Sequence, residues 1–401
     1  MRDLLGAPAA LLGAARGLQP RTVALRRALH RRPETGLTLP HALDLVRSEL
    51  ADLPLRLHVG RELTSLVAVL DGGGPGPTTL LRADMDALPL QEDAAVDHAS
   101  EVPGVMHACG HDLHTAMLAS AARLLCDRRQ DVPGRVMLMF QPGEEGYHGA
   151  RLMIDEGLLD RHGPGGRPDA AFALHVSATM PTGELHLRPG PIMAAADVLR
   201  VTVTGRGGHA SAPHHARDPV PAAAAMVGAL QTMVTRRVDT HDPTVLTISR
   251  ISAGTTDNVI PETAEMVGTL RTMSEPVRRA LHREIERVCT HTALAHDCTA
   301  RVEIESGYPV TVNDPGATAR LADTGRRLLG DTRVCTMPTP IMGAEDFAYV
   351  LEQVPGALAF LGACPPGTAP HEAAPNHSNR VRFDEAAMPA GVALYAALAM
   401  G

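Results

Sequence analysis

The sequence predicts an α/β protein in which a mixed, mainly parallel sheet is sandwiched by helices, with a second, α+β domain inserted into the first. Three observations lead to this prediction. Short apolar runs alternate with helical patterns up to about residue 190, a different succession of strands and helices follows, and the first pattern resumes near the C-terminus. At 401 residues the chain is also long for one hydrophobic core, so two domains are expected.

Three apolar runs in the first region are predicted as buried strands, at residues 78–83, 136–140 and 170–174. Helical periodicity over residues 115–125 and 150–159 predicts a helix after each of the first two strands. This alternation is typical of a parallel sheet that helices cover on both faces.

The middle region predicts a β-α-β-β-α-β unit, which is the ferredoxin-like split arrangement. Its strands are expected at residues 198–204, 244–252, 262–273 and 300–305, and its helices at 219–234 and 275–294. Beyond it we expect helices at 316–329 and 345–352, a strand at 357–361 and a closing helix from residue 385. The main domain is therefore predicted over residues 1–194 and 308–401, and the inserted domain over 195–307.

Composition narrows the possible function. The formal charge is −8, and no basic cluster with interleaved aromatics offers a surface for nucleic acid. No apolar run reaches the length of a membrane span, and Asp3 and Pro8 make the apolar stretch 4–15 a poor signal peptide. The six cysteines are dispersed without paired spacing, so we expect no disulfide framework and a cytoplasmic location.

The segment from His107 to His114 contains three histidines, one cysteine and one aspartate. A thiolate and imidazoles are ligands that suit zinc and its neighbours in the transition series. Cys109 and His111 are two residues apart, which fits a loop that enters a helix better than a helix itself. The alternative is a solvated histidine-rich turn with an inert cysteine.

Reactive side chains also follow three successive predicted strands. Asp84 and Asp86 follow the first strand, Glu144 and Glu145 the second, and His175 the third. Ligands bind beyond the carboxyl ends of strands in open α/β sheets, so these residues are expected to share one site. The adjacent glutamates suit two tasks, because one can bind a metal while the other moves a proton.

Ten short motifs, in order, give the chain a family resemblance. They are HRRPE from His30, RADMDALP from Arg82, HACGHD from His107, QPGEEG from Gln141, ALHV from Ala173, GGHAS from Gly207, DNVIPE from Asp257, GTLRT from Gly268, GAEDF from Gly343 and NHSN from Asn376. The chain resembles the M20 metallopeptidase superfamily, specifically its amidohydrolase branch of hippurate hydrolases, N-acyl-amino-acid aminoacylases and auxin-conjugate hydrolases. The resemblance implies a zinc-peptidase-like catalytic domain with an inserted lid.

That resemblance also implies roles for individual residues. It implies two divalent metal ions per subunit. Zinc is the expected metal, and manganese, cobalt or nickel are the alternatives. It implies Glu144 as general base and Asp86 as the residue that orients the ligands, while Asp84 falls where other branches have a ligand histidine. The implied metal ligands are Cys109, His111, Glu145, His175 and His377.

The inserted domain becomes a lid and dimerisation domain by the same resemblance. His209 is expected to stabilise the oxyanion, in its own or a partner subunit's site, and Asn258 and Arg271 to hold the substrate carboxylate. An arginine fork suits a terminal carboxylate because it binds in two places at once. A homodimer is therefore expected.

The resulting functional prediction is metal-dependent hydrolysis of the amide bond in small N-acyl-amino acids. One alternative is a dipeptidase or carboxypeptidase of the same superfamily, although the sequence offers no identifiable partner for a free α-amine. Another is a non-catalytic metal-binding protein, which the loss of Glu144 or of a ligand would favour. A zinc deaminase is disfavoured because its His-x-Glu and Pro-Cys-x-x-Cys signature is absent.

Overall fold

The computed structural model describes residues 7–401, and it divides into two compact units. The large unit comprises the chain up to Ile192 together with Val312–Thr339 and Asp346–Gly401. The small unit comprises Met193–Thr311 and the short segment Pro340–Glu345. The chain first enters the small unit within β7 (Gly190–Met193) and leaves it within β14 (Thr311–Asn313), and it enters that unit again at Pro340.

An eight-stranded sheet forms the centre of the large unit, in the order β1-β2-β4-β3-β5-β16-β6-β15. The pairs β3–β4, β3–β5, β5–β16 and β6–β15 are parallel, so the predicted mixed, mainly parallel sheet is confirmed. The strands are β1 (Arg56–Val59), β2 (Leu66–Asp71), β3 (Gly74–Asp84), β4 (Pro133–Gln141), β5 (Ala170–Ser177), β6 (Leu185–Leu187), β15 (Val334–Thr336) and β16 (Gly356–Gly362).

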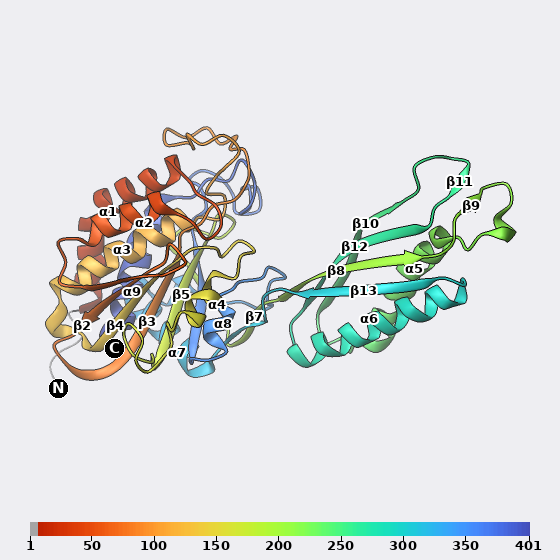
Figure 1. The fold of residues 1–401 in the computed structure, drawn as a ribbon. Coiled ribbons are helices and arrows are strands. Elements are labelled where there is room, and N and C mark those ends of the chain that lie inside the picture. The colour runs from red at the N-terminus through yellow and green to blue at the C-terminus, as the bar shows by residue number, and fades with distance from the viewer. Residues whose placement is uncertain (1–6) are drawn as a thin grey trace. The chain divides into compact units, whose positions relative to one another are not determined.

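Helices flank this sheet (Figure 1). One layer contains the long helices. Within it, α3 and α9 pack on the strands, and α1 packs on α3 and α9. The short α4 and α8 contact each other, and α4 also contacts β4. The bounds are α1 (Ala7–Arg31), α2 (Pro40–Leu50), α3 (His111–Asp127), α4 (Gly149–Asp155), α7 (Pro315–Leu329), α8 (Ala348–Leu351) and α9 (Met388–Met400).

Alternation along the central strands separates the two faces of the sheet. Leu81 and Ala83 are buried in the same core cluster as Leu113 of α3 and Leu394 of α9. Arg82 lies between them in sequence and therefore points to the opposite face. There its guanidinium carbon lies 5.6 Å from the centre of the Phe347 ring, next to α8. One face of the sheet is thus apolar, whereas the other carries buried polar groups toward the strand ends.

The small unit is a four-stranded antiparallel sheet with two helices. Its strand order is β10-β12-β8-β13, which is the order of the ferredoxin-like split arrangement. Asp218 and Ser274 cap its helices by accepting hydrogen bonds from Val220 and Val277 backbone amides. The elements are β8 (Ala195–Thr204), β9 (Gly208–His209), α5 (Pro219–Arg237), β10 (Thr244–Ala253), β11 (Val259–Ile260), β12 (Thr263–Thr272), α6 (Glu275–Ala295) and β13 (Thr299–Ser306).

Two predicted helices are shorter than expected. The helix predicted to residue 159 ends at Asp155, and Gly157 has a left-handed φ of 98° that cannot continue it. The helix predicted over residues 345–352 is only α8, and the Asp346 carboxylate before it accepts a hydrogen bond from the Ala150 backbone amide. The remaining single turns are 3₁₀ helices at Arg129–Asp131, Pro213–His215, Asp331–Arg333 and Glu385–Ala387.

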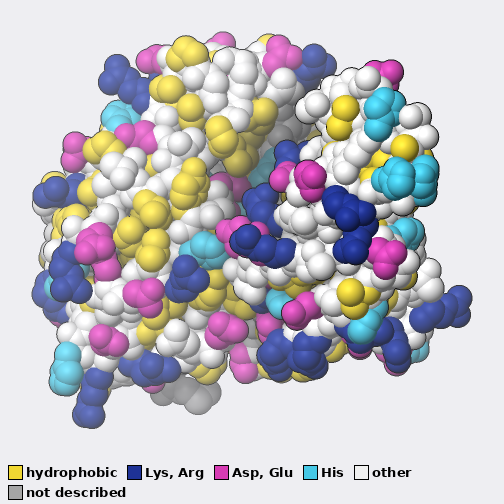
Figure 2. All heavy atoms as spheres, turned by 45° about the vertical axis from the view of Figure 1, so that its right-hand side comes forward, with side chains coloured by type: hydrophobic (Ala, Val, Ile, Leu, Met, Phe, Trp, Pro, Cys, Tyr) yellow, Lys and Arg dark blue, Asp and Glu magenta, His cyan; other side chains and the backbone are white. Residues whose placement is uncertain are grey.

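Several elements were not predicted from periodicity. They include α2, β1 and β2, which precede β3, and the three-residue strands β6 and β15. Residues 4–6 of the apolar N-terminal stretch lie outside the described residues. Within the described chain, no helix is both long and apolar enough to cross a membrane. Figure 2 shows acidic and basic side chains interspersed over the face that it displays.

Candidate metal centre

The parallel pairing of the central strands brings the predicted residues to one edge of the sheet. β4 and β5 both pair in parallel with β3, so the carboxyl ends of these three strands are adjacent. Asp84 is the last residue of β3, Glu144 and Glu145 follow β4, and His175 lies near the end of β5. The prediction that the strand ends share one site therefore agrees with the observed topology.

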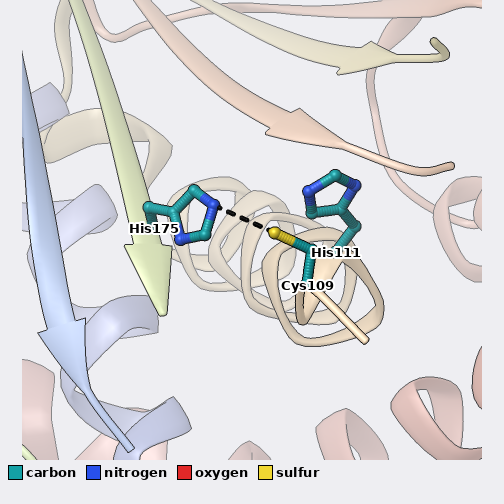
Figure 3. A group of neighbouring side chains, drawn as sticks. All are labelled: Cys109, His111 and His175. Carbon is teal, nitrogen blue, oxygen red and sulfur yellow. Dashed lines mark hydrogen bonds between the residues drawn. The ribbon is translucent and has the colours of Figure 1, made fainter. Parts of the chain in front are cut away.

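Cys109, His111 and His175 lie close together at this edge of the sheet (Figure 3). The Cys109 Sγ atom lies 3.4 Å from His175 Nε2. The Nδ1–H groups of both histidines donate to backbone carbonyls, of Asp86 for His111 (2.8 Å) and of Val176 for His175 (2.9 Å). Because Nδ1 is engaged in each ring, Nε2 is the nitrogen left for a metal ion, as is usual for metal-binding histidines.

Gly110 makes the tight turn between Cys109 and α3 possible. Its φ is 87°, and a Cβ atom there would lie 2.3 Å from Val176 Cγ2. Any larger residue would therefore be strained and would collide with β5. The turn allows the thiol before the helix and the first imidazole of the helix to point into one space.

Glu145 and His377 complete the group from distant parts of the chain. His377 Nε2 lies 3.2 Å from Cys109 Sγ and 3.3 Å from Glu145 Oε1. His377 has a left-handed φ of 69°, and its amide donates to the Ala108 carbonyl at 2.8 Å. Unfavourable backbone conformations of this kind persist where the surroundings impose them, often at functional sites.

Asp86 holds the two glutamates in place. Its carboxylate accepts hydrogen bonds from the backbone amides of Glu144 and Glu145, both at 3.0 Å. Its carbonyl oxygen also accepts the bond from His111. One aspartate therefore contacts the backbone of a candidate ligand and of a candidate base, and also an imidazole. That Asp86 orients metal ligands, as the family resemblance implies, stays a prediction.

The donor atoms fit a pair of cations on geometric grounds. Side chains around one zinc ion, with ligand distances of about 2.0–2.3 Å, lie roughly 3–4 Å from each other. The contacts of Cys109 with His175 and His377 fall in that range. The buried Nε2 atom of His111 has no hydrogen-bond partner in the described part of the chain, as expected for an atom that awaits a ligand. Cys109 belongs to two candidate groups, one with His111 and His175 and one with Glu145 and His377.

The electrostatics of the protein alone also favour a cation here. Burial and the neighbouring His114 hold the pKa of His175 well below its usual range, so this ring is neutral. The hydrogen bond to Cys109 and the contact with Glu145 raise the pKa of His377 to about 10. At His111, burial lowers the pKa, but the charge of Asp84 outweighs burial and raises the pKa well above normal. The cluster thus attracts positive charge, which bound metal ions would supply in place of these protons.

A buried polar network lies next to the candidate metal centre, and the sequence analysis did not predict it. Arg82 donates to Asp84 at 2.7 Å and to Asp346 at 3.0 Å. Asp84 accepts a 2.6 Å hydrogen bond from His114 Nδ1–H, and His114 Nε2 in turn accepts the Val176 amide at 2.8 Å. Asp84 Oδ2 lies 3.6 Å from His111 Nε2. The signal was the Arg-x-Asp spacing on one strand, which puts both side chains on one face.

His209 and Asn258 lie together on the small unit. The strands β9 and β11 pair Val259 with His209, and the Ala210 amide donates to the Asn258 carbonyl at 3.0 Å. The two residues line an open hollow of about 410 Å³ with Gly207, Gly208, Val259, Ile260, Pro261 and Glu262. His209 Nδ1 accepts a hydrogen bond from the Ser211 backbone amide at 3.1 Å, so the proton of the neutral ring is on Nε2.

Arg271 does not join them within the unit. It lies in β12 opposite Ala196 of β8 and Val245 of β10, whereas the hollow adjoins the other end of β12, at Thr263. Eight residues at about 3.3 Å each separate Thr263 from Arg271, roughly 26 Å along the strand. Burial lowers the pKa of the half-buried Arg271.

Comparisons with known proteins place these features in a family. Residues 80–401 match the model of Peptidase family M20/M25/M40. "IAA-amino acid hydrolase ILR1-like 2" of Arabidopsis thaliana is 37% identical over 382 residues, which cover 94% of this chain and 84% of that protein. "Thermostable carboxypeptidase 2" of Saccharolobus solfataricus is 37% identical over 385 residues, which cover 94% of each.

A solved structure agrees with these relatives. The YXEP protein of Bacillus subtilis, described as a dinuclear metal binding peptidase from the M20 family, has a TM-score of 0.82 and 30% identity. The match covers 96% of this chain and 98% of that one. The resemblance drawn from the ten motifs is therefore confirmed, and the chain belongs to peptidase family M20/M25/M40.

Proposed function

We propose that this protein is a metal-dependent amidohydrolase that cleaves N-acyl-amino acids to a carboxylic acid and a free amino acid. One observation carries the proposal: thiol, imidazole and carboxylate ligands converge around Cys109, directly beside Glu144. The similarity to a relative named as an IAA-amino acid hydrolase supports this substrate class. The six free cysteines favour a reducing compartment, so we infer a cytoplasmic location.

Five residues would hold the two divalent ions. Zinc suits the mixture of sulfur, nitrogen and oxygen donors, and manganese, cobalt or nickel are the alternatives. When bound, the ions would polarise the scissile carbonyl and lower the pKa of the attacking water. The similarity to a dinuclear metal binding peptidase supports a pair of ions. The proposed ligands are Cys109, His111, Glu145, His175 and His377.

Glu144 is the proposed general base. Its carboxylate belongs to the group with His111 and Glu145, and its side chain is buried. In our proposal it takes a proton from the attacking water as the new C–O bond forms. It then gives that proton to the amide nitrogen as the C–N bond breaks, so that the amino acid leaves as a neutral amine. Asp86 keeps Glu144 in place through the backbone amide.

The small unit would supply the remaining contacts. We assign His209, whose Nε2–H is available, to the oxyanion, and Asn258 and Arg271 to the substrate carboxylate. Because Arg271 lies at the opposite end of β12 from His209, one copy of this unit cannot hold both on one small substrate. We therefore infer a homodimer through the small unit, in which one subunit supplies Arg271 and its partner supplies the equivalents of His209 and Asn258.

A carboxypeptidase is the second candidate, because a relative of equal identity carries that name. A panel of N-acetyl-, N-benzoyl- and long-chain-acyl-amino acids, tested beside matched peptides with each metal, separates the two. We expect the acylated amino acids to give the higher kcat/KM. A higher kcat/KM for the peptides would favour the carboxypeptidase instead. If a chelator reduced the activity on neither class of substrate, both candidates would be contradicted.

A further inference from the structure

Glu184, His186 and Cys335 form a second group of metal-ligand type at the far edge of the large sheet. Glu184 directly precedes β6, and His186 is its middle residue, so the two side chains share a face. Cys335 is the parallel register partner of His186 on the edge strand β15. Paired residues point to the same side of a sheet, so all three lie on one face.

The opposite face of the same strand fixes this arrangement. Leu185 and Leu187 are buried in the main core cluster, whereas the side chains of Glu184 and His186 are 27% and 19% exposed. A strand with its alternate residues locked in the core cannot slip in register without exposing them. The group is therefore held by the fold and remains open to solvent.

The distances within the group are close to those around a tetrahedral ion. His186 Nε2 lies 3.1 Å from Glu184 Oε2, and Cys335 Sγ lies 3.8 Å from the same oxygen. With ligand bonds of about 2.0 to 2.3 Å, such pairs would be roughly 3.3 to 3.6 Å apart. All three donor atoms lie within 4.8 Å of one another, so a small shift would close the group around one ion.

We propose that Glu184, His186 and Cys335 bind a further divalent cation of borderline softness, zinc first, with a water molecule in the fourth position. Thiolate and imidazole donors favour zinc, cobalt or nickel over magnesium or calcium, which prefer oxygen donors. With three ligands on an open edge, the ion exchanges with solvent rather than serving as a closed structural site.

This site is separate from the centre around Cys109. His175 pairs with Phe360 of β16, Phe360 pairs with His186, and His186 pairs with Cys335. His186 is therefore two strands from His175, about 10 Å at the usual strand spacing. No ligand is shared, and the proposal does not depend on the proposed hydrolysis. An ion here would join β15 to β6 and so stabilise the edge of the sheet.

Thiol protection tests the proposal on the intact wild-type protein. Protein already loaded at its main centre is titrated with zinc chloride alone, treated with N-ethylmaleimide, and digested to measure modification of each cysteine by mass. At a zinc concentration about ten times the dissociation constant, alkylation of Cys335 should slow by about tenfold. Cys126, partly buried like Cys335, is the internal control and should be unaffected.

His186→Ala and Glu184→Gln identify the other ligands. Both variants should retain hydrolysis, because neither residue belongs to the main centre, and both should lose the zinc protection of Cys335. Unchanged alkylation of wild-type Cys335 in zinc would overturn the proposal. Full protection in both variants would overturn it as well, because the thiol alone would then bind the metal. Hydrolysis is measured in the same samples, so failure here is distinguishable from failure of the proposed function.

Discussion

The Nε2 atom of His377 lies 3.2 Å from the Sγ atom of Cys109, although 268 residues separate the two in sequence. The His377 amide also donates to the carbonyl of Ala108, so backbone and side chain are both tied to the turn before α3. Distant segments of the chain thus converge on one thiol.

Replacing Glu144 by Gln should lower kcat by about 10²- to 10⁴-fold, because the amide cannot carry the proton. The metal content should be unchanged, since Glu144 is not among the proposed ligands. Steady-state kinetics and elemental analysis of the same preparation check both parts. Glu101→Gln, at an exposed surface carboxylate, is the matched control. A fully active Glu144→Gln protein would remove this residue from the role of base.

Removal of the ions should inactivate and destabilise the protein together. If the ions are present at about 100 times their dissociation constant, chelation removes roughly 2.7 kcal/mol of stability per site. Differential scanning fluorimetry with and without chelator measures the shift, and added zinc should reverse it. Cys109→Ser should abolish most of the shift, whereas Cys126→Ser should preserve it. Equal shifts in both variants would argue against Cys109 as a ligand.

Mixing two inactive variants tests whether His209 acts across a dimer. Subunits of Glu144→Gln and His209→Ala are combined, and subunit exchange pairs them at random. If His209 serves the partner's site, half of the dimers contain one intact site, and about a quarter of wild-type activity returns. If His209 serves its own subunit, every site lacks one group and the mixture stays inactive.

Arg271→Ala should discriminate against substrates that carry a free carboxylate. A charge-assisted hydrogen bond contributes about 1.5–3 kcal/mol, so kcat/KM for the acid should fall by roughly ten- to a hundredfold. The corresponding substrate amide should lose far less. Arg271→Lys should recover part of the loss, because it keeps the charge but not the planar fork. Equal losses for acid and amide would assign another role to this arginine.

The stability of the small unit should fall in acid because of Asp197. Burial opposes the effect, but hydrogen bonds from His282 and Arg278 lower the pKa of Asp197 below its unfolded value. The stabilisation is therefore present above about pH 4, the unfolded pKa, and is lost as the pH falls through the lower folded pKa. Hydrogen exchange of β8 and α6 amides should accelerate on acidification in the wild type, and Asp197→Asn should weaken that dependence. Identical pH profiles would contradict this assignment.

Elements whose local pattern is strong could be predicted from the sequence. The strands β3 to β5 contain short apolar runs, and the helices α5 and α6 have helical periodicity. The order of strands and helices then indicates that Asp86, Glu144 and His175 are neighbours, because parallel strands end at the same edge of a sheet. By contrast, β6 and β15 span three residues each, too few for a periodic pattern to emerge.

Contacts that depend on tertiary pairing could not be predicted in this way. Asp346 accepts a hydrogen bond from Gln141 across 205 residues, and neither neighbourhood contains a hint of the other. The pairing of His186 with Cys335 likewise follows only from the register of β6 and β15. Family motifs could assign His209 and Arg271 to one substrate, but only the register of β12 reveals how far apart they lie in one unit.

Anomalous diffraction from crystals of the zinc-loaded protein, recorded at the zinc absorption edge, tests the central claim most directly. We predict two peaks beside Cys109 Sγ, each within bonding distance of at least one of His111, Glu145, His175 and His377. A map with no peak among these side chains would contradict the proposed metal centre and the hydrolysis that depends on it.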